Sequence, residues 1–262
     1  MQKIKSLKRF GQNYLVDKNI IKKIVDTINP QPEDQIVEIG PGLGALTEKI
    51  LERVPSLTAV EIDKRVADDL KLKFPQLKLI TGDFVKLDLN ELKKNAGDKL
   101  KIAGNIPYNL TSPILFHLIK FNDILKDAVL MVQHEVAKRM SGKKGTKDYG
   151  ILSVLLNYFA EVKYCFKVSP NVFLPKPKVH SAVVHLVFKQ LNISEEEKQS
   201  FIQIVKASFG NRRKTLKNSL SNSIFNELNF TESGIDLSLR AEQLDRDDFL
   251  RLAEFARSKK NK

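Results

Sequence analysis

The sequence predicts an α/β fold in which a parallel sheet carries helices on both faces and is followed by a small all-helical domain. Short apolar runs alternate with amphipathic helical segments up to residue 133, which is the pattern of parallel strands joined by helices. A glycine-rich turn at 40–44 lies between one strand and the next helix, and after residue 190 the pattern is helical to the end. We therefore expect a first domain over 1–190 and a second over 191–262.

The individual elements follow from the period of their apolar residues. Asp17 can cap the first helix and Pro30 can end it. We expect strands at 35–39, 57–62, 77–80, 99–104 and 127–133, helices at 17–28, 45–54, 63–74, 112–121 and 149–159, and two closing strands at 162–168 and 179–188. The helices of the second domain are expected at 194–210, 211–222 and 245–258, the first of them opened by a capping box at Ser194.

The 262-residue chain is strongly basic. Its 44 lysine and arginine residues outnumber 31 aspartate and glutamate residues, so the net charge is +13. Such an excess favours a polyanionic partner, either nucleic acid or an anionic membrane surface. Stretches without acidic residues recur at 1–16, 138–147, 162–194 and 206–226, which is the pattern of a surface that contacts phosphates.

The cysteine and histidine content argues against a metal protein. Cys165 is the single cysteine of the sequence, which excludes an internal disulfide and favours a reducing compartment. His117, His180 and His185 have no further His or Cys at ligand spacing, so we expect no metal site. No apolar run approaches the ~18–20 residues that span a bilayer, and the basic N-terminus lacks the apolar core of a secretory signal. We expect a cytoplasmic protein without membrane attachment.

The glycine-rich segment 38–45, EIGPGLGA, lets the backbone turn tightly and approach a ligand beneath the N-terminus of the next helix. Glu61 ends the following strand, 21 residues after Gly40, where a carboxylate accepts hydrogen bonds from ribose hydroxyls. These features predict an adenosine-containing cofactor and leave open a dinucleotide, as in dehydrogenases, or S-adenosylmethionine. Pro41 removes an N–H that a pyrophosphate would use, and Asp83 can accept a hydrogen bond from the adenine amine. The series resembles class I S-adenosylmethionine-dependent methyltransferases.

The segment Asn105-Ile106-Pro107-Tyr108 follows the fourth strand and therefore lies at the carboxyl edge of the sheet, beside the cofactor crevice. An adenine amine is a poor nucleophile because its lone pair is delocalised into the ring. The side-chain oxygen of Asn105 and the carbonyl of Ile106 can accept hydrogen bonds from its two N–H groups and aim the lone pair at a methyl donor. Pro107 rigidifies the turn, and Tyr108 offers a face for base stacking. After the cofactor loop, this motif predicts an amino-group methyltransferase.

Motifs along nearly the whole chain are shared with one family. They are FGQNYL (10–15), EIGPGLGALT (38–47), VEID (60–63), GNIPYNLTSPILF (104–116), NVFLPKPKVHSAVVHL (171–186), FGNRRKTLKNSL (209–220) and RAEQLDRDDFLRLA (240–253). The chain resembles the KsgA-type ribosomal RNA adenine dimethyltransferases, which put two methyl groups on each of two adjacent adenines near the 3′ end of small-subunit (16S) rRNA. The resemblance implies a class I, Rossmann-like methyltransferase sheet with a C-terminal helical domain, S-adenosylmethionine as cofactor, and a role in ribosome biogenesis.

The resemblance also implies roles for matching positions. The implied cofactor site consists of Asn13, Leu15, Gly40, Glu61, Asp83 and Asn105. Asn105, Pro107 and Tyr108 would act on the target adenine, and Phe173 would stack on it opposite Tyr108. The departures from the family pattern are mild.

Three positions carry these departures. Tyr14 stands where phenylalanine is usual and Ile106 where leucine is common, and both preserve the shape of the side chain. Phe84 stands where a small residue is frequent, so the packing of the cofactor's adenine can differ here.

The resemblance further implies that the helical domain binds structured rRNA of the small ribosomal subunit, in a pre-30S particle. The basic segment of that domain is the strongest candidate for phosphate contacts, which we expect from Arg212, Arg213, Lys214 and Lys217. RNA fits better than duplex DNA, since a base presented from a loop needs less unstacking. We expect the protein to act as a monomer.

Two other hypotheses remain open. The Erm-type large-subunit rRNA adenine methyltransferases share FGQN- and NIPY-like motifs, although RRKTLKNSL (212–220) and the segment 240–253 favour the KsgA type. A non-catalytic ribosome-assembly or transcription factor on the same fold is the second hypothesis, and the intact GPGLG and NIPY motifs argue for retained activity.

Overall fold

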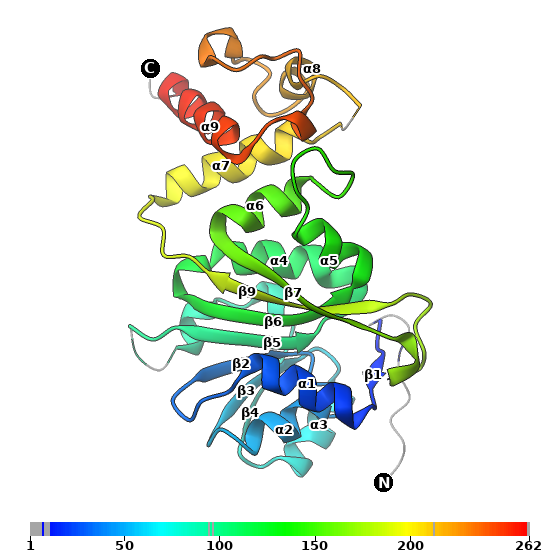
Figure 1. Ribbon diagram of the computed structural model, residues 1–262. Coiled ribbons are helices and arrows are strands. Elements are labelled where there is room, and N and C mark those ends of the chain that lie inside the picture. The colour runs from blue at the N-terminus through cyan, green and yellow to red at the C-terminus, as the bar shows by residue number, and fades with distance from the viewer. Residues whose placement is uncertain (1–6, 8–10, 94, 96, 212, 261–262) are drawn as a thin grey trace. The chain divides into compact units, whose positions relative to one another are not determined.

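The computed structural model describes residues 7, 11–93, 95, 97–211 and 213–260 (Figure 1). It confirms the α/β class that the sequence predicts. The chain divides into two compact units, the first made of residues 1–137 and 161–189 and the second of residues 138–160 and 190–262. Among the described helices, none is long and apolar enough to cross a membrane.

A seven-stranded sheet forms the centre of the first unit. Its strands are β2 (Gln35–Ile39), β3 (Leu57–Glu61), β4 (Leu77–Thr81), β5 (Leu100–Asn105), β6 (Leu125–Gln133), β7 (Ala160–Val168) and β9 (Ser181–Phe188). They lie in the order β4-β3-β2-β5-β6-β9-β7; β2 to β6 are parallel, and β9 is antiparallel to β6. The chain adds β3 and β4 on one side of β2, and β5 and β6 on the other. Ligands bind outside the carboxyl ends of the strands at such a switch point.

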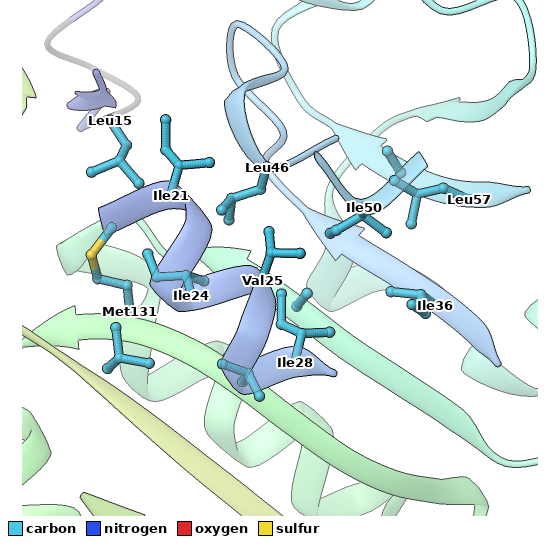
Figure 2. Packing of buried hydrophobic residues seen from close by; sticks show 14 of the residues in the cluster. Leu15, Ile21, Ile24, Val25, Ile28, Ile36, Leu46, Ile50, Leu57 and Met131 are labelled. Atoms are coloured by element: carbon cyan, nitrogen blue, oxygen red, sulfur yellow. The ribbon is translucent and has the colours of Figure 1, made fainter. Parts of the chain in front are cut away.

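Helices α1 (Lys18–Ile28), α2 (Ala45–Leu51), α3 (Lys64–Lys73) and α4 (Thr111–Lys120) alternate with these strands. Asp17 caps α1, as predicted, because its carboxylate accepts hydrogen bonds from the first N–H groups of the helix. Figure 2 shows the apolar face of α1, with Ile24 and Val25, packed with Leu46 and Ile50 of α2 in one buried cluster. Each buried side chain of this size contributes about 1.5–3 kcal/mol. Packing in this cluster therefore holds the start of α1 and the segment before it in place.

A separate two-stranded ladder joins β1 (Tyr14–Leu15) to β8 (Phe173–Leu174), and the sequence analysis did not predict it. The strands are antiparallel, with Tyr14 opposite Leu174 and Leu15 opposite Phe173. The N–H of Val16 extends the ladder by donating to the carbonyl of Val172 at 2.9 Å. The ladder joins residues 11–16, which we call the N-terminal arm, to the proline-rich segment 169–178 that follows β7.

The second unit is helical, with α6 (Ile151–Phe159), α7 (Glu195–Ser208), α8 (Leu216–Ser221) and α9 (Arg246–Lys260). The capping box at Ser194 is present. The predicted helix 211–222 is wrong in its first part, because Thr215 caps α8 and residues 211, 213 and 214 are not helical. Helix α5 (His134–Met140) was not predicted.

Residues 138–160 group with the second unit, whereas the sequence analysis placed them in the first domain. Tyr149 supplies the physical reason. Its hydroxyl donates to the carbonyl of Leu244 at 3.0 Å, and its ring packs edge-on against Phe209. The segment therefore joins the helical unit, although it precedes β7 in the chain.

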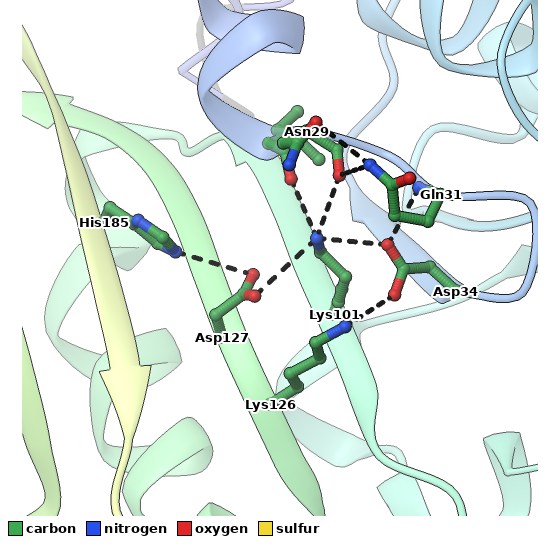
Figure 3. A network of polar contacts seen from close by, with 8 residues as sticks. Asn29, Gln31, Asp34, Lys101, Lys126, Asp127 and His185 are labelled. Carbon is green, nitrogen blue, oxygen red and sulfur yellow. Dashed lines mark hydrogen bonds and ion pairs between the residues drawn. The ribbon is translucent and has the colours of Figure 1, made fainter.

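Lys101 carries a buried charge near the amino end of β5 (Figure 3). Its Nζ lies 3.1 Å from Asp34 Oδ2 and 3.7 Å from Asp127 Oδ2, and it donates to the carbonyl of Ile28 at 2.8 Å. These contacts tie the end of α1 to the starts of three strands. A buried charge that loses its partners is strongly destabilising, so the network holds the end of the sheet opposite the carboxyl edge.

Candidate active site

One cavity opens at the carboxyl edge of the sheet, at the switch point between β2 and β5. Its wall contains all six positions expected to bind the cofactor, which are Asn13, Leu15, Gly40, Glu61, Asp83 and Asn105. They come from the arm, from the loop after β2, from the ends of β3 and β5 and from the turn after β4. The parallel topology therefore brings together residues up to 92 positions apart, such as Asn13 and Asn105.

The glycine loop after β2 needs residues without a Cβ. Gly42 and Gly44 have φ values of 55° and 84°, where other residues are strained. A Cβ on Gly44 would lie 2.5 Å from a ring carbon of Phe74, and a Cβ on Gly42 would lie 3.0 Å from the ring of Tyr14. At Gly40 an added Cβ would meet nothing within 4 Å, so the open side of this residue faces free space.

Glu61 is the buried carboxylate at the end of β3. Its Oε1 accepts the N–H of Asp63 at 2.9 Å, and its Oε2 accepts the N–H of Gly42 at 3.3 Å. Burial raises the pKa of Glu61, and these backbone hydrogen bonds oppose the rise. The carboxylate is therefore held in place between the glycine loop and α3, and can accept hydrogen bonds from a diol.

Glu38, at the end of β2, also lines the cavity, and the sequence analysis gave it no role. It is fully buried, and the hydroxyl of Thr47 donates to its Oε2 at 2.6 Å. Burial raises the pKa of Glu38 to about 7, and the nearby Glu61 adds to the rise. The sequence did contain a signal for a role of Glu38, because this glutamate lies four residues before the middle glycine of the GxGxG loop.

The charge of the cavity is opposite to that of the whole chain. Its described wall contains the carboxyl groups of Glu38, Glu61 and Asp83 but no lysine or arginine, although the chain carries +13. Such a wall suits a cationic ligand and disfavours a pyrophosphate. It fits the sulfonium and ammonium groups of S-adenosylmethionine better than a nicotinamide dinucleotide.

The NIPY motif lies beside these carboxyl groups, with Asn105, Pro107 and Tyr108 in the cavity wall. The side-chain Nδ2 of Asn105 donates to the carbonyl of Asn13 at 2.9 Å. The hydroxyl of Tyr108 lies 2.8 Å from Oγ of Ser181 at the start of β9, and burial raises the pKa of Tyr108. The motif is therefore tied on one side to the arm and on the other to the antiparallel part of the sheet.

The arm covers one side of the cavity. The Nε2 of Gln12 donates to Asp63 Oδ2 at 3.1 Å, and Tyr14 packs its ring on Gly42. The Tyr14 hydroxyl is buried and has no hydrogen-bond partner among the residues that the structure describes, and burial together with Glu61 raises the pKa of Tyr14 to about 12. The sequence analysis noted Tyr14 as a departure from the family pattern but did not predict these contacts.

Phe173 differs in position from the other predicted site residues. Only 4% of it is exposed, and it belongs to the buried apolar cluster together with Leu15. It does not belong to the described wall of the cavity. Stacking of Phe173 on a target base therefore stays a prediction, and it requires that the ring be uncovered.

The predicted RNA-binding residues lie in the second unit. Arg213 and Lys214 are exposed in the turn before α8, and Lys217 is exposed within it. Arg212 lies outside the described residues. Among the residues that the structure describes, no group of three or more His, Cys, Asp or Glu is arranged to hold a metal ion.

Comparisons with known proteins agree with this geometry. Residues 3–258 match the family model described as ribosomal RNA adenine dimethylase. Ribosomal RNA small subunit methyltransferase A of Chlorobium phaeobacteroides (strain DSM 266) is 47% identical over 94% of this chain and 90% of its own length. The protein of the same name from Thiobacillus denitrificans is 44% identical over 92% of this chain and 94% of its own length.

Solved structures give the same result for the fold. A dimethyladenosine transferase from Plasmodium falciparum is similar with a TM-score of 0.75 and 27% identity, covering 94% of this chain and 98% of that one. The 23S rRNA methyltransferase ErmE is similar with a TM-score of 0.65 and 26% identity, covering 92% and 98%. Both similarities span the sheet and the helical unit.

Proposed function

The chain belongs to the ribosomal RNA adenine dimethylase family, and we propose that it transfers methyl groups from S-adenosylmethionine to adenine amines of small-subunit ribosomal RNA. The relatives that are 44% and 47% identical over nearly the whole chain carry a small-subunit name, which favours this substrate over large-subunit rRNA. The proposal includes dimethylation of two adjacent adenines near the 3′ end, as the resemblance to the KsgA-type enzymes implies.

The orientation of Asn105 is the observation that carries the proposal. Its amide nitrogen is engaged by the carbonyl of Asn13, and only the nitrogen can donate to a carbonyl. The side-chain oxygen is therefore left to accept a hydrogen bond from a ligand in the cavity. An adenine amine that donates to this oxygen and to the Ile106 carbonyl is drawn out of conjugation, so its lone pair can attack.

The wall of the cavity suits the methyl donor. S-adenosylmethionine supplies an electrophilic methyl group on a positively charged sulfur. Glu61 would accept the ribose hydroxyls, Asp83 would accept from the adenine amine, and the open side of Gly40 leaves room for the amino-acid end. Asn13, Leu15 and Asn105 would complete this site from the arm and from β5.

On the substrate side, Tyr108 would present its ring face to the target adenine, and Pro107 would keep the turn rigid. Phe173 would stack on the opposite face once its ring is uncovered. Positioning of this kind can supply much of the rate enhancement without a tuned general base.

The proposed partner is the small ribosomal subunit in its pre-30S form, bound by the helical domain, residues 191–262. Phosphate contacts would come from Arg212, Arg213, Lys214 and Lys217. A ribosomal partner implies action in the cytoplasm, where ribosomes are assembled. One active site and one docking surface on the same chain are compatible with a monomer.

Labelled S-adenosylmethionine tests the proposal directly. We would incubate the protein with unmodified small subunits and, separately, with unmodified large subunits, and then map the methylated base. Label on adjacent adenines of small-subunit rRNA is the expected result. Label on the large subunit would favour the Erm type, and tight particle binding without transfer would favour a non-catalytic assembly factor.

A further inference from the structure

The residue after Phe173 is an exposed leucine next to a buried side chain. Leu174 is 61% exposed, whereas Phe173 is only 4% exposed. Successive residues of a strand point to opposite faces, so the two-residue strand β8 buries one side chain and presents the other. The pairing of β8 with β1 therefore holds Leu174 at the surface of the first unit.

Leu174 lies close to the candidate active site. It is the ladder partner of Tyr14, and paired residues of an antiparallel ladder have Cα atoms about 4.5–5.5 Å apart. Tyr14 lines the cavity, and its neighbour Asn13 holds Asn105. Leu174 is therefore one ladder step from Tyr14 in the wall of the cavity.

The segment that follows Leu174 is anchored at its far end. His134 donates its N–H to the carbonyl of His180 at 2.9 Å, and Ser181 lies at hydrogen-bond distance from the Tyr108 hydroxyl. The loop 175–180 thus begins at the arm and ends at the NIPY motif. With Pro175 and Pro177 in it, the loop has restricted backbone freedom.

The exposed side chains of this loop suit a nucleic acid. Lys176 and Lys178 are exposed, and the sequence from 162 to 194 contains no acidic residue. Val179 is 42% exposed and Val16, beside the ladder, is 53% exposed. Cations that contact phosphates beside exposed apolar side chains are the combination by which proteins unstack bases.

We propose that Leu174 is an apolar wedge that stacks on the nucleotide next to the target adenine when that adenine enters the cavity, an inference that rests on the proposed function. A base that leaves its stack uncovers the face of its neighbour, and unstacking costs a few kcal/mol. Leu174 covers that face, while Lys176 and Lys178 hold the flanking phosphates. The wedge thereby favours the extruded state of the adenine.

The test uses the full-length protein with Leu174→Ala, Leu174→Met and a matched control, Leu72→Ala. Leu72 is 82% exposed on α3 and has no proposed role. Single-turnover methylation is measured on small subunits reconstituted with ordinary rRNA, or with rRNA that is abasic at one nucleotide adjacent to the target. Leu174→Ala should slow transfer to ordinary rRNA by about tenfold, the size of effect expected when a leucine that buries its apolar surface is shortened to alanine.

Four further results are expected. Leu174→Met should restore most of the rate, and Leu72→Ala should match the wild type. On rRNA that is abasic at the stacked position, wild type and Leu174→Ala should react at equal rates, because the wedge has no base to cover. The salt dependence of particle binding should not change with Leu174→Ala, since no charge is removed.

The possible results distinguish a failure of the Leu174 wedge from a failure of the proposed function. A Leu174→Ala rate equal to that of Leu72→Ala on ordinary rRNA overturns the wedge, as does a defect that persists with an abasic nucleotide on either side of the target. Wild-type protein that transfers no methyl group to any small subunit overturns the proposed function itself, and the wedge with it.

Discussion

The side-chain amide of Asn105 donates a hydrogen bond to the main-chain carbonyl of Asn13 at 2.9 Å. This contact joins the end of β5 to the N-terminal arm, and it determines which end of the amide faces the cavity. Because the nitrogen is engaged, the oxygen is the atom available to a ligand. The arm therefore orients the residue on which the proposed chemistry depends.

Replacing this residue tests the mechanism. Asn105→Ala should slow single-turnover methyl transfer by about 10²–10³, the usual effect of losing one preorganised polar contact in a transition state. Particle binding should survive, since most of it comes from phosphate contacts elsewhere. Asn90→Ala, at an exposed asparagine of the same unit, is the control and should behave as wild type. Near-normal transfer by the Asn105 variant would refute the proposed role of the amide.

Glu61→Ala should weaken S-adenosylmethionine binding by roughly tenfold or more, because two ribose hydroxyls lose a charged acceptor. The N–H groups of Gly42 and Asp63 also lose their partner, so the glycine loop becomes less ordered. Calorimetry on the folded variant measures the change, with Glu91→Ala at an exposed position as control. Unchanged affinity would remove Glu61 from the site, and binding of a nicotinamide dinucleotide would contradict the cofactor assignment.

Much of the sheet could be predicted because buried parallel strands are short, continuous apolar runs. The predicted strand 35–39 coincides with β2, and most of the other boundaries differ by one or two residues. The ladder of β1 and β8 could not be predicted. A strand of two residues is too short to show an alternation of apolar and polar side chains, and each of these strands is stabilised by the other. The basic residues 212–214 favour a helix by propensity, but the Thr215 cap begins α8 after them.

The part of the site that follows from the topology of the sheet could be predicted from the sequence. Acids and an asparagine that end parallel strands must meet at one edge of the sheet, so Glu61, Asp83 and Asn105 share a cavity. Contacts between distant segments leave no local signal, and the bond between Tyr108 and Ser181 is of this kind. The burial of Phe173 likewise depends on the arm lying opposite it.

The basic residues of the second unit should dominate the salt dependence of particle binding. Replacing Arg213, Lys214 and Lys217 together by alanine removes three exposed charges, so fewer counterions are released on binding. We expect weaker binding and a shallower slope of log affinity against log salt, with unchanged cofactor affinity. The control removes Lys64, Lys71 and Lys78, three exposed lysines of the first unit. Equal slopes for the two triple variants would refute docking through the helical domain.

Removing the hydroxyl of Tyr14 and removing that of Tyr108 should change the stability of the protein in opposite directions. Within the described part of the chain the Tyr14 hydroxyl is buried without a partner, so Tyr14→Phe relieves a desolvation penalty and should raise the free energy of unfolding by about 1 kcal/mol. The Tyr108 hydroxyl is bonded to Ser181, so Tyr108→Phe should lower it by about 0.5–1.5 kcal/mol. Denaturant unfolding without cofactor measures both. Destabilisation by both variants would show that the Tyr14 hydroxyl has a partner in solution.

Glu38 should make stability depend on pH in the direction opposite to most carboxylates. Burial raises its pKa from 4.5 to about 7, so between these values the folded protein binds more protons than the unfolded chain. Its contribution to the free energy of unfolding is therefore fully present below about pH 4.5. It falls by up to about 1.4 kcal/mol per pH unit as the pH rises toward 7. Glu38→Gln keeps an acceptor for the Thr47 hydroxyl but cannot ionise, so the variant should gain stability relative to wild type as the pH rises from 5 to 8. Urea midpoints at several pH values measure this difference. A constant difference across that range would mean that Glu38 ionises at the same pH in the folded and unfolded states.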